Sequence, residues 1–214
     1  DPDPIDLARA GDESFQGLNT HGAVVGLGAP VAGRDPLPYL FVGDAAHELA
    51  LVPGDETGAA LAISDEGWVV GFSGGEAAPW HQGVVERLSF PGAAFSAAED
   101  VNDRGVAVGT ATAGGLVAVI WRGSSGVPLP DLGDSLSTAR AINDDSWVVG
   151  DFRRKHYHGP GDNGIAALWL GDQVYDLNAL TIDLPAGVRI NSAVDVNEAG
   201  QIVGVATVGN TRRA

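Results

Sequence analysis

The sequence lacks cysteine and methionine, and Lys155 is its single lysine among 214 residues. Without cysteine the chain has no disulfide framework, no thiolate metal site and no cysteine nucleophile. No apolar run reaches the length that a bilayer-spanning helix requires. The chain begins Asp1-Pro2-Asp3-Pro4 instead of with methionine, so we expect a processed product, for example after removal of a secretion signal, or a fragment.

Basic residues are few relative to acidic ones. The chain has 28 acidic and 12 basic residues, so its formal net charge at pH 7 is −16. A surface of this charge repels nucleic acid and anionic lipid headgroups at long range, and we expect no nucleic-acid partner and no membrane insertion. Acidity with so little lysine favours a secreted, extracellular or periplasmic location, although a GC-rich genome produces the same bias towards arginine.

Five segments share one pattern, in which an apolar residue is followed by a polar turn and a valine-rich run that ends in glycine. They are residues 18–26, 63–71, 101–109, 142–150 and 196–204. The final glycines are 45, 38, 41 and 54 residues apart, a period of about 43 residues. Each segment predicts a β-hairpin, because the turn glycine can adopt positive φ and the turn Asn or Ser can bond the backbone. Ser146 replaces that glycine in the fourth copy, so this turn is expected to be strained or differently shaped.

Two weaker signals recur between the hairpins. A third strand is expected to end at a glycine in the first four copies, at Gly43, Gly83, Gly123 and Gly171. A fourth short strand is expected where an acidic residue stands close before a leucine, as at Glu48, Glu86, Asp131 and Asp176. A propeller blade is a four-stranded antiparallel sheet, and blades that pack face to face bury strands such as Val69-Val70 on both sides. We therefore predict an all-β fold, a single five-bladed β-propeller domain over residues 1–214.

The two ends of the chain complement each other in this scheme. The fifth copy reaches only the start of its third strand, at Thr211-Arg212-Arg213-Ala214. Ile5-Asp6-Leu7, before the first copy, has the pattern of the missing fourth strand. We expect this N-terminal strand to complete the last blade and close the ring, because closure removes exposed sheet edges.

The repeat resembles the HAF-type extracellular repeat family, in which an Ile-Asn-Asp-x-Gly-x-Val-Val-Gly run alternates with an Ala-Phe-Leu-Trp strand and an Asp-Leu-Gly element. The residues that carry the resemblance are 141–150, Ala167-Leu168-Trp169 and Asp131-Leu132-Gly133. It covers nearly the whole chain, although the first two copies are degenerate. The resemblance implies an exported bacterial or archaeal protein with a propeller-like fold, and it implies no catalytic residues.

The longest interval between repeats contains an insertion, predicted as a loop over residues 151–164. Its basic and aromatic residues are the candidate ligand-binding residues Arg153, Arg154, Lys155, His156, Tyr157 and His158. As a binding loop it would take an anionic or sugar ligand, with Arg153 and Arg154 as donors and Tyr157 as a stacking face. The alternative is a solvated loop whose charges neutralise nearby acids.

Metal sites have little support. His156 and His158 could share a metal on an extended strand, but the three adjacent cations would repel the ion. The spacing Asp100-x-Asn102-x-x-Gly105 is similar to that of a calcium loop, yet no bidentate glutamate follows it and turn chemistry explains the same residues. We predict no metal and no cofactor, with Ca²⁺ as an alternative.

Trp68 and Trp147 stand at the same position after their turns and are two further candidates for ligand binding. They could be platforms on which sugars stack, but aromatic residues at a strand start more often pack between blades. The chain has no Gly-x-Ser-x-Gly elbow, phosphate loop, His-Glu-x-x-His or dinucleotide fingerprint, so we predict that it is not an enzyme.

These observations predict a non-catalytic extracellular binding propeller, lectin-like, whose partner is a carbohydrate or a protein surface. The first alternative is a structural or assembly protein of the cell exterior that self-associates. The second is a small propeller hydrolase whose carboxylates converge on the central channel.

Overall fold

The computed structural model describes residues 14–28, 37–133, 135–154, 164–209 and 211–213. These residues form five antiparallel sheets in which the strands follow one another in chain order. The first two sheets contain β1 (Ser14–Leu18), β2 (Val24–Gly28), β3 (Leu37–Val42), β4 (Ala45–Glu48), β5 (Gly58–Ile63), β6 (Val69–Ser73), β7 (Glu76–His81) and β8 (Val84–Val85). The third and fourth contain β9 (Ser96–Val101), β10 (Val106–Thr112), β11 (Leu116–Arg122), β12 (Gly126–Pro128), β13 (Ser135–Ile142), β14 (Trp147–Arg154), β15 (Gly164–Leu170) and β16 (Gln173–Asp176). The fifth contains β17 (Val188–Val196), β18 (Ile202–Val208) and β19 (Thr211–Arg213), and the short helix α1 (Leu177–Leu180) precedes it.

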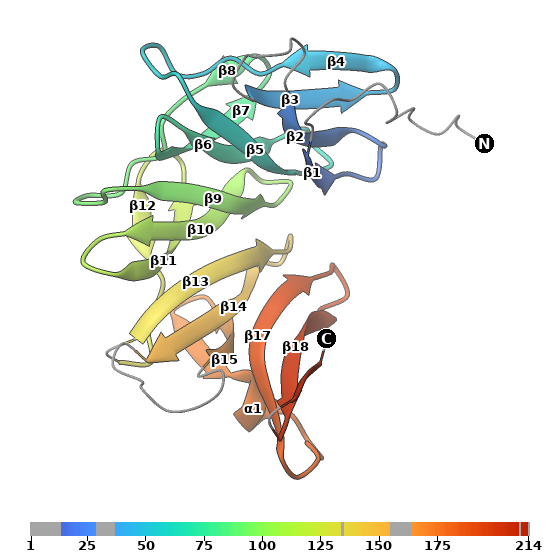
Figure 1. The fold of residues 1–214 in the computed structure, drawn as a ribbon, viewed down its shortest axis with the longest axis vertical. Helices are drawn as coiled ribbons and strands as arrows, with labels where there is room; N and C mark the ends of the chain where they lie inside the picture. Colours follow the sequence, from blue (N-terminus) through green and yellow to red (C-terminus); the bar gives the residue numbers. More distant parts are fainter. Residues whose placement is uncertain (1–13, 29–36, 134, 155–163, 210, 214) are drawn as a thin grey trace.

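Successive sheets pack face to face and form an arc (Figure 1). The first strand of each sheet lies on the concave side, where β1 contacts β5, β5 contacts β9, β9 contacts β13 and β13 contacts β17. The fourth strands lie on the outer side. Within the described ranges the fifth sheet does not pack against the first in the way that neighbouring sheets do.

In each of the first four sheets a buried valine of the second strand packs on the next sheet. Val25, Val70, Val108 and Val149 all have no exposed surface. The fully buried Trp121 and Trp169 lie in the same inter-sheet cores. Four of the core clusters each combine residues of two neighbouring sheets, and a smaller cluster of Leu37, Tyr39 and Phe41 belongs to the first sheet alone.

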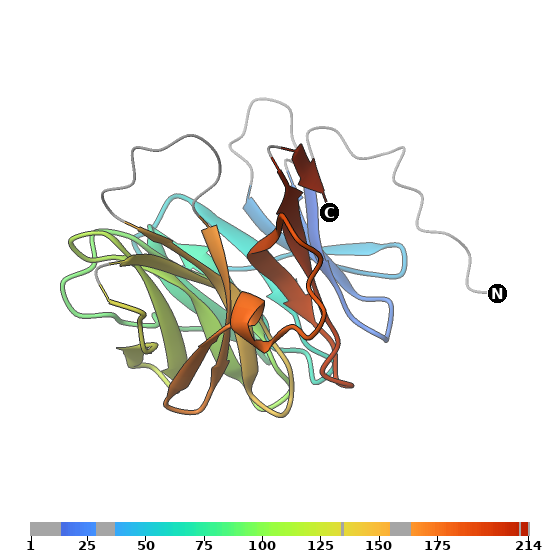
Figure 2. The ribbon, with the colours of Figure 1, turned by 90° about the horizontal axis from the view of Figure 1, so that it is seen from below.

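The turns of the five hairpins are hydrogen-bonded to one another on one side of the arc, the lower side in Figure 2. The side-chain amide of Asn102 donates to the backbone oxygen of Asn143 at 3.1 Å, and that of Asn143 donates to the oxygen of Asn197 at 3.2 Å. Each amide oxygen also accepts from its own turn, as Asn143 does from the N–H of Trp147 at 2.9 Å. The Asn of the repeat therefore stabilises its own hairpin and joins it to the next one.

Every first strand contains a β-bulge at the same place. The bulged residues are Gln16, Leu61, Glu99, Arg140 and Val194, each ten positions before the final glycine of its motif. That glycine faces the bulged backbone, so a Cβ on Gly150 would overlap the oxygen of Thr138. The bulge thus explains why all five copies end in glycine.

The all-β class and the four-stranded antiparallel sheets predicted from the repeat are confirmed in the first four sheets, and the fifth has three described strands. β3, β11 and β15 end directly before their glycines, and β7 ends at His81, one residue earlier. The acidic residue closes the fourth strand at Glu48 and Asp176, whereas β8 and β12 end before Glu86 and Asp131. Ser146 adopts a φ of 61°, so the strain predicted for its turn is present.

Two other predictions at the ends of the repeats have different outcomes. Residues 151–154 and 164, assigned to the insertion loop, belong instead to β14 and β15, which pair as far as Arg153 and Gly164. The predicted N-terminal strand Ile5-Asp6-Leu7 lies outside the described residues. No helix in the described part of the chain has the length and apolar character needed to cross a bilayer.

A candidate ligand-binding cleft between the fourth and fifth sheets

A polar cleft of about 130 Å³ lies between β13, β14 and the fifth sheet. Its lining residues are Arg140, Asp151, Arg153, Gly164, Asn191, Ser192, Val194 and Val205. Three of them are bulged residues, because β17 has a second bulge at Asn191 in addition to the one at Val194. Bulges redirect side chains relative to a regular strand and are frequent next to binding sites.

Asp151 is the buried centre of this cleft, with only 3% of its side chain exposed. Its Oδ1 accepts from the Nε of Arg140 at 2.8 Å and from the hydroxyl of Ser192 at 3.0 Å. The Nε of Arg153 lies 3.6 Å from the other carboxylate oxygen. The carboxylate therefore holds two guanidinium groups and connects the fourth sheet to the fifth, and a buried charge requires such pairing.

Asn191 is the second buried polar residue of the cleft, 1% exposed. Its Nδ2 donates to the backbone oxygen of Gly164 at 3.4 Å. Its Oδ1 has no hydrogen-bond partner among the described residues. Buried polar atoms are nearly always hydrogen-bonded, so an acceptor without a partner in a cleft indicates a place for a donor from a ligand or from water.

The guanidinium groups of Arg140 and Arg153 stand at the mouth of the cleft, with 38% and 55% of their side chains exposed. Each group has five N–H donors, and the bonds to Asp151 use only a small part of them. The cleft consequently offers several donors beside one acceptor.

Glu99, the bulged residue of the third sheet, adds a carboxylate to the Arg140 side of the site. The surrounding protein desolvates this carboxylate and raises its pKa, and the positive charge of Arg140 opposes the shift. Glu99 therefore lies within electrostatic reach of Arg140, so bulged residues of neighbouring sheets interact along the concave side.

Of the six residues predicted in the insertion, Arg153 and Arg154 are described and the other four, Lys155, His156, Tyr157 and His158, lie outside the described residues. Arg153 belongs to the cleft, and Arg154 is an exposed residue at the end of β14. Arginine at 153 was therefore selected from sequence for its charge, while its partners Arg140 and Asp151 were missed. Arg140 stands at the bulged position, ten residues before Gly150, but the five copies share no side-chain type at that position.

The two candidate tryptophans lie at the turns on the other side of the sheets. Trp68 stacks on His81 with ring centroids 3.8 Å apart, and its indole lies against Gly105 of the next turn. Trp147 lies against Gly200 in the same way. Each indole thus packs between its own sheet and the turn of the following sheet, which is the packing interpretation considered above.

Asp100 and Asn102, which suggested a calcium loop, take part in contacts between sheets. Asp100 accepts from the N–H of Ile142 at 2.8 Å, and Asn102 donates to the next turn. Burial raises the pKa of Asp100 to about 7, although the backbone N–H groups of Ile142 and Val101 favour its charged form. Over the described ranges no three His, Cys, Asp or Glu side chains come together as a metal site.

Comparison with known proteins adds no assignment, since no family model matches the chain and no curated protein sequence matches it.

Proposed function

We propose that the five sheets are the blades of a β-propeller and that the chain is a non-catalytic extracellular binding protein whose ligand site is the cleft around Asp151. The propeller proposal is supported by four-stranded sheets that pack face to face with their first strands on the concave side. The resemblance to HAF-type repeats supports the same architecture and an exported protein. Closure of the ring by the N-terminal strand remains a prediction within this proposal.

The ligand we propose is a sugar acid, a molecule with a carboxylate beside hydroxyl groups. The single observation that carries this choice is the unpaired Oδ1 of Asn191 in a cleft that also holds two half-exposed guanidinium groups. Guanidinium groups bind carboxylates in a bidentate manner, and a neighbouring ligand hydroxyl would donate to Asn191. A cleft of about 130 Å³ accommodates the carboxylate end of such a ligand rather than a whole oligosaccharide.

Binding without catalysis fits the state of the carboxylate. Asp151 is bonded to Arg140 and Ser192 and lies near Arg153, so its oxygens are engaged in contacts within the protein. A glycosidase needs two carboxyl groups that face the scissile bond, one of them available as an acid. Asp151 lines the cleft, whereas the other nearby carboxylate, Glu99, interacts with Arg140 and is not a lining residue.

Isothermal titration with galacturonic acid tests the proposal, with galactose and acetate as the matched neutral and sugar-free ligands. We expect saturable binding of galacturonic acid, with weaker binding of both reference ligands. Arg153→Ala should weaken binding about tenfold or more, because a charge-assisted hydrogen bond is lost. Arg122→Ala is the control, since Arg122 is an exposed arginine at the end of β11, outside the cleft.

The outcomes separate the alternatives. If Arg122→Ala and Arg153→Ala weaken the binding of galacturonic acid equally, the anion is attracted by the overall charge of the protein and does not bind specifically in the cleft. Tight binding of galactose would support a sugar-binding function but would show that the carboxylate of the ligand is not needed for binding. No heat with any of the three ligands would rule out the sugar-acid site and favour the structural alternative.

A further inference from the structure

Glu99 and Arg140 occupy equivalent positions in neighbouring sheets. Each is the bulged residue of its first strand, ten positions before the final glycine of its motif. β9 and β13 contact each other on the concave side of the arc (Figure 1). Next to the two bulges, Oδ2 of Asp100 accepts the N–H of Ile142 at 2.8 Å and ties the two strands together. The two bulges are therefore held beside each other.

Glu99 acts on Arg140 through its charge and not through a direct contact. Within the described ranges Glu99 forms no ion pair, whereas Nε of Arg140 lies 2.8 Å from Oδ1 of Asp151. The Glu99 side chain reaches solvent on the concave side, but the surrounding protein partly desolvates it and raises its pKa. Glu99 therefore takes up a proton closer to neutral pH than an ordinary glutamate does, although the charge of Arg140 opposes this shift.

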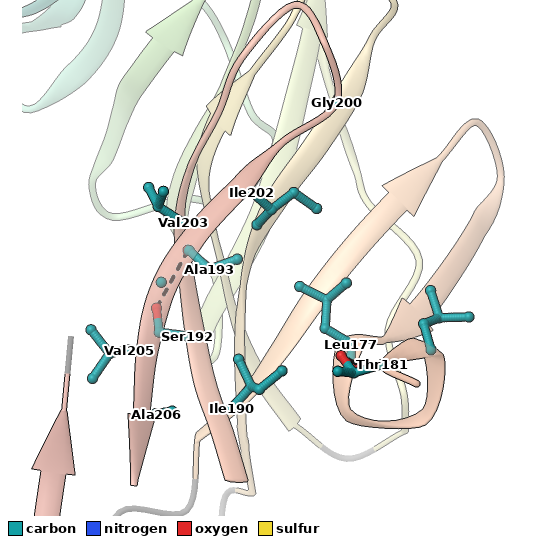
Figure 3. Close-up of a pocket in the computed structure, with 12 residues that line it drawn as sticks. Leu177, Thr181, Ile190, Ser192, Ala193, Gly200, Ile202, Val203, Val205 and Ala206 are labelled. Atoms are coloured by element: carbon teal, nitrogen blue, oxygen red, sulfur yellow. Dashed lines mark hydrogen bonds between the residues drawn. The ribbon is translucent and has the colours of Figure 1, made fainter. Parts of the chain in front are cut away.

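An anion bound in the polar cleft meets few charged side chains. The fifth sheet contributes only uncharged residues to the lining. One of them is Ser192, which Figure 3 shows among the apolar side chains of β17 and β18. The fourth sheet contributes Arg140, Arg153 and Asp151, so that two guanidinium groups against one carboxylate leave one net positive charge. An ionised Glu99 beside Arg140 cancels this charge, and a protonated Glu99 restores it.

Other titratable groups near Glu99 are few. Of the strands packed against β9, β5, β6 and β10 have no charged or titratable side chain, β13 has Arg140, and β7 has Glu76 and His81. Glu76 lies 3.7 Å from an arginine that follows β8, and the ring of His81 stacks on a tryptophan. Asp100, the next residue of β9, directs its carboxylate to two backbone N–H groups. Glu99 is therefore the carboxyl group of β9 that faces Arg140.

We propose that Glu99 regulates ligand binding in this cleft: in its ionised form it opposes the carboxylate of a sugar acid at Arg140, and in its protonated form it leaves the charge of Arg140 to the ligand. This inference rests on the proposed function and adds its regulation. Because the ligand anion and the Glu99 carboxylate repel each other and share one guanidinium group, binding of the anion and protonation of Glu99 favour each other. The affinity for a sugar acid therefore rises as the pH falls from neutral, and binding is accompanied by uptake of a proton.

Isothermal titration of the intact chain with galacturonic acid, from about pH 5 to about pH 8, compares the parent with Glu99→Gln. At about pH 7 the variant should bind about threefold to tenfold more tightly, because one like charge near a partly exposed site is removed. The difference should shrink towards about pH 5. Titrations in buffers of different ionisation enthalpy measure the proton uptake, which should be smaller in the variant. Titration of the ligand, of His81 and of Asp100 is common to both proteins and cancels in the comparison.

Glu86→Gln is the matched control, because it removes the same charge from an exposed glutamate that follows β8, the fourth strand of the second sheet. It should bind galacturonic acid within about twofold of the parent, since solvent and salt screen a distant exposed charge. If Glu99→Gln has the affinity and proton uptake of the parent at every pH, or if Glu86→Gln tightens binding equally, regulation by Glu99 is overturned while the sugar-acid site stands. Absence of binding in both the parent and Glu99→Gln would overturn the sugar-acid site and its regulation together.

Discussion

Gly150 lies against the backbone oxygen of Thr138, directly across from the bulge at Arg140, and leaves no room for a Cβ. Gly150→Ala should therefore destabilise the protein by about 3 kcal/mol, the upper range for an overpacked core, since the backbone of the bulge has to move. Chemical denaturation with the free energy of unfolding as readout measures this. Gly22→Ala is the control, because Gly22 has open space and only a left-handed φ of 77°. A cost of about 1–2 kcal/mol is expected there, and an equal cost for both variants would contradict the steric explanation.

Ser146 is the residue of the fourth turn that holds the position of a glycine, with a φ of 61°. Ser146→Gly should stabilise the protein by about 0.5–1 kcal/mol, because relief of the left-handed strain exceeds the added entropy of the unfolded chain. Gly67→Ser is the reverse change in the second turn, which also precedes a tryptophan and has open space at its glycine. The midpoint temperature of thermal unfolding should rise in Ser146→Gly and fall in Gly67→Ser. A change of the same sign in both variants would show that φ at this position does not determine the stability.

The Asn that joins one turn to the next should have a larger effect on stability in the middle of the arc than at its end. Asn143→Ala removes one of the two bonds to the oxygen of Asn197, which keeps the N–H of Gly200, and leaves the N–H of Trp147 without the side-chain oxygen of Asn143, so a loss of about 2–3 kcal/mol is expected. Asn197→Ala is the matched variant, since the Nδ2 of Asn197 bonds within its own turn, to Gln201. Asn197→Ala should lower the free energy of unfolding by only about 1 kcal/mol. The free energies of unfolding of the two variants are compared by urea denaturation. Similar decreases in both would show that the amide of Asn143 does not stabilise the contact between sheets.

Asp100 should make the protein less stable as the pH rises from about 4 to about 7. Its pKa in the folded chain is about 7, above the ordinary 3.8, so across this window the unfolded chain releases a proton that the folded chain retains. Below about pH 4 Asp100 is protonated in both the folded and the unfolded chain, and the free energy of unfolding has its full value. Above about pH 7 Asp100 is ionised in both, and the decrease in the free energy of unfolding is complete. Besides burial, Asp195 and Glu198 favour the neutral form.

Asp100→Asn tests this pH dependence. Unfolding free energies measured from pH 4 to pH 8 should fall less in the variant than in the parent chain, leaving the part that comes from Glu99. Asp172→Asn is the control, because Asp172 is exposed and is not among the charges that shift the pKa of Asp100. It should keep the parent profile. An unchanged profile in Asp100→Asn would show that this carboxyl does not titrate within the window.

The hairpins could be predicted from sequence because their signals are local. Asn102, Gly105 and the apolar residues that follow them recur at fixed spacing, and this pattern specifies a turn between two strands wherever it occurs. The recurrence of the final glycine could also be recognised in the sequence, but the structural reason for it could not. The bulge that it faces is a property of the paired backbone, and the bulged residues have no common side-chain type, so no residue pattern marks them.

The cleft could be predicted only in part for the same reason. Arg153 was selected because it lies in a basic run. Asp151 and Arg140 are eleven positions apart and come together only through the β13–β14 pairing, while Ser192 belongs to the next repeat. A repeat pattern describes what the copies share, whereas the cleft depends on residues in which the copies differ. The arrangement of the sheets as an arc likewise depends on packing between copies.

The hydrogen-bonded chain of turns connects each sheet only to its neighbours in sequence, through amides such as that of Asn143. Among the described residues the fifth sheet packs against one neighbour and the third against two, so without the proposed closure of the ring the fifth sheet would open first. The fifth sheet, with an exposed Val203, would therefore exchange its amide protons for deuterium sooner than the third, where Val108 is sealed on both sides. Its opening would be an independent local event, and the Asp151 contacts that cross to Ser192 would be broken each time it occurs.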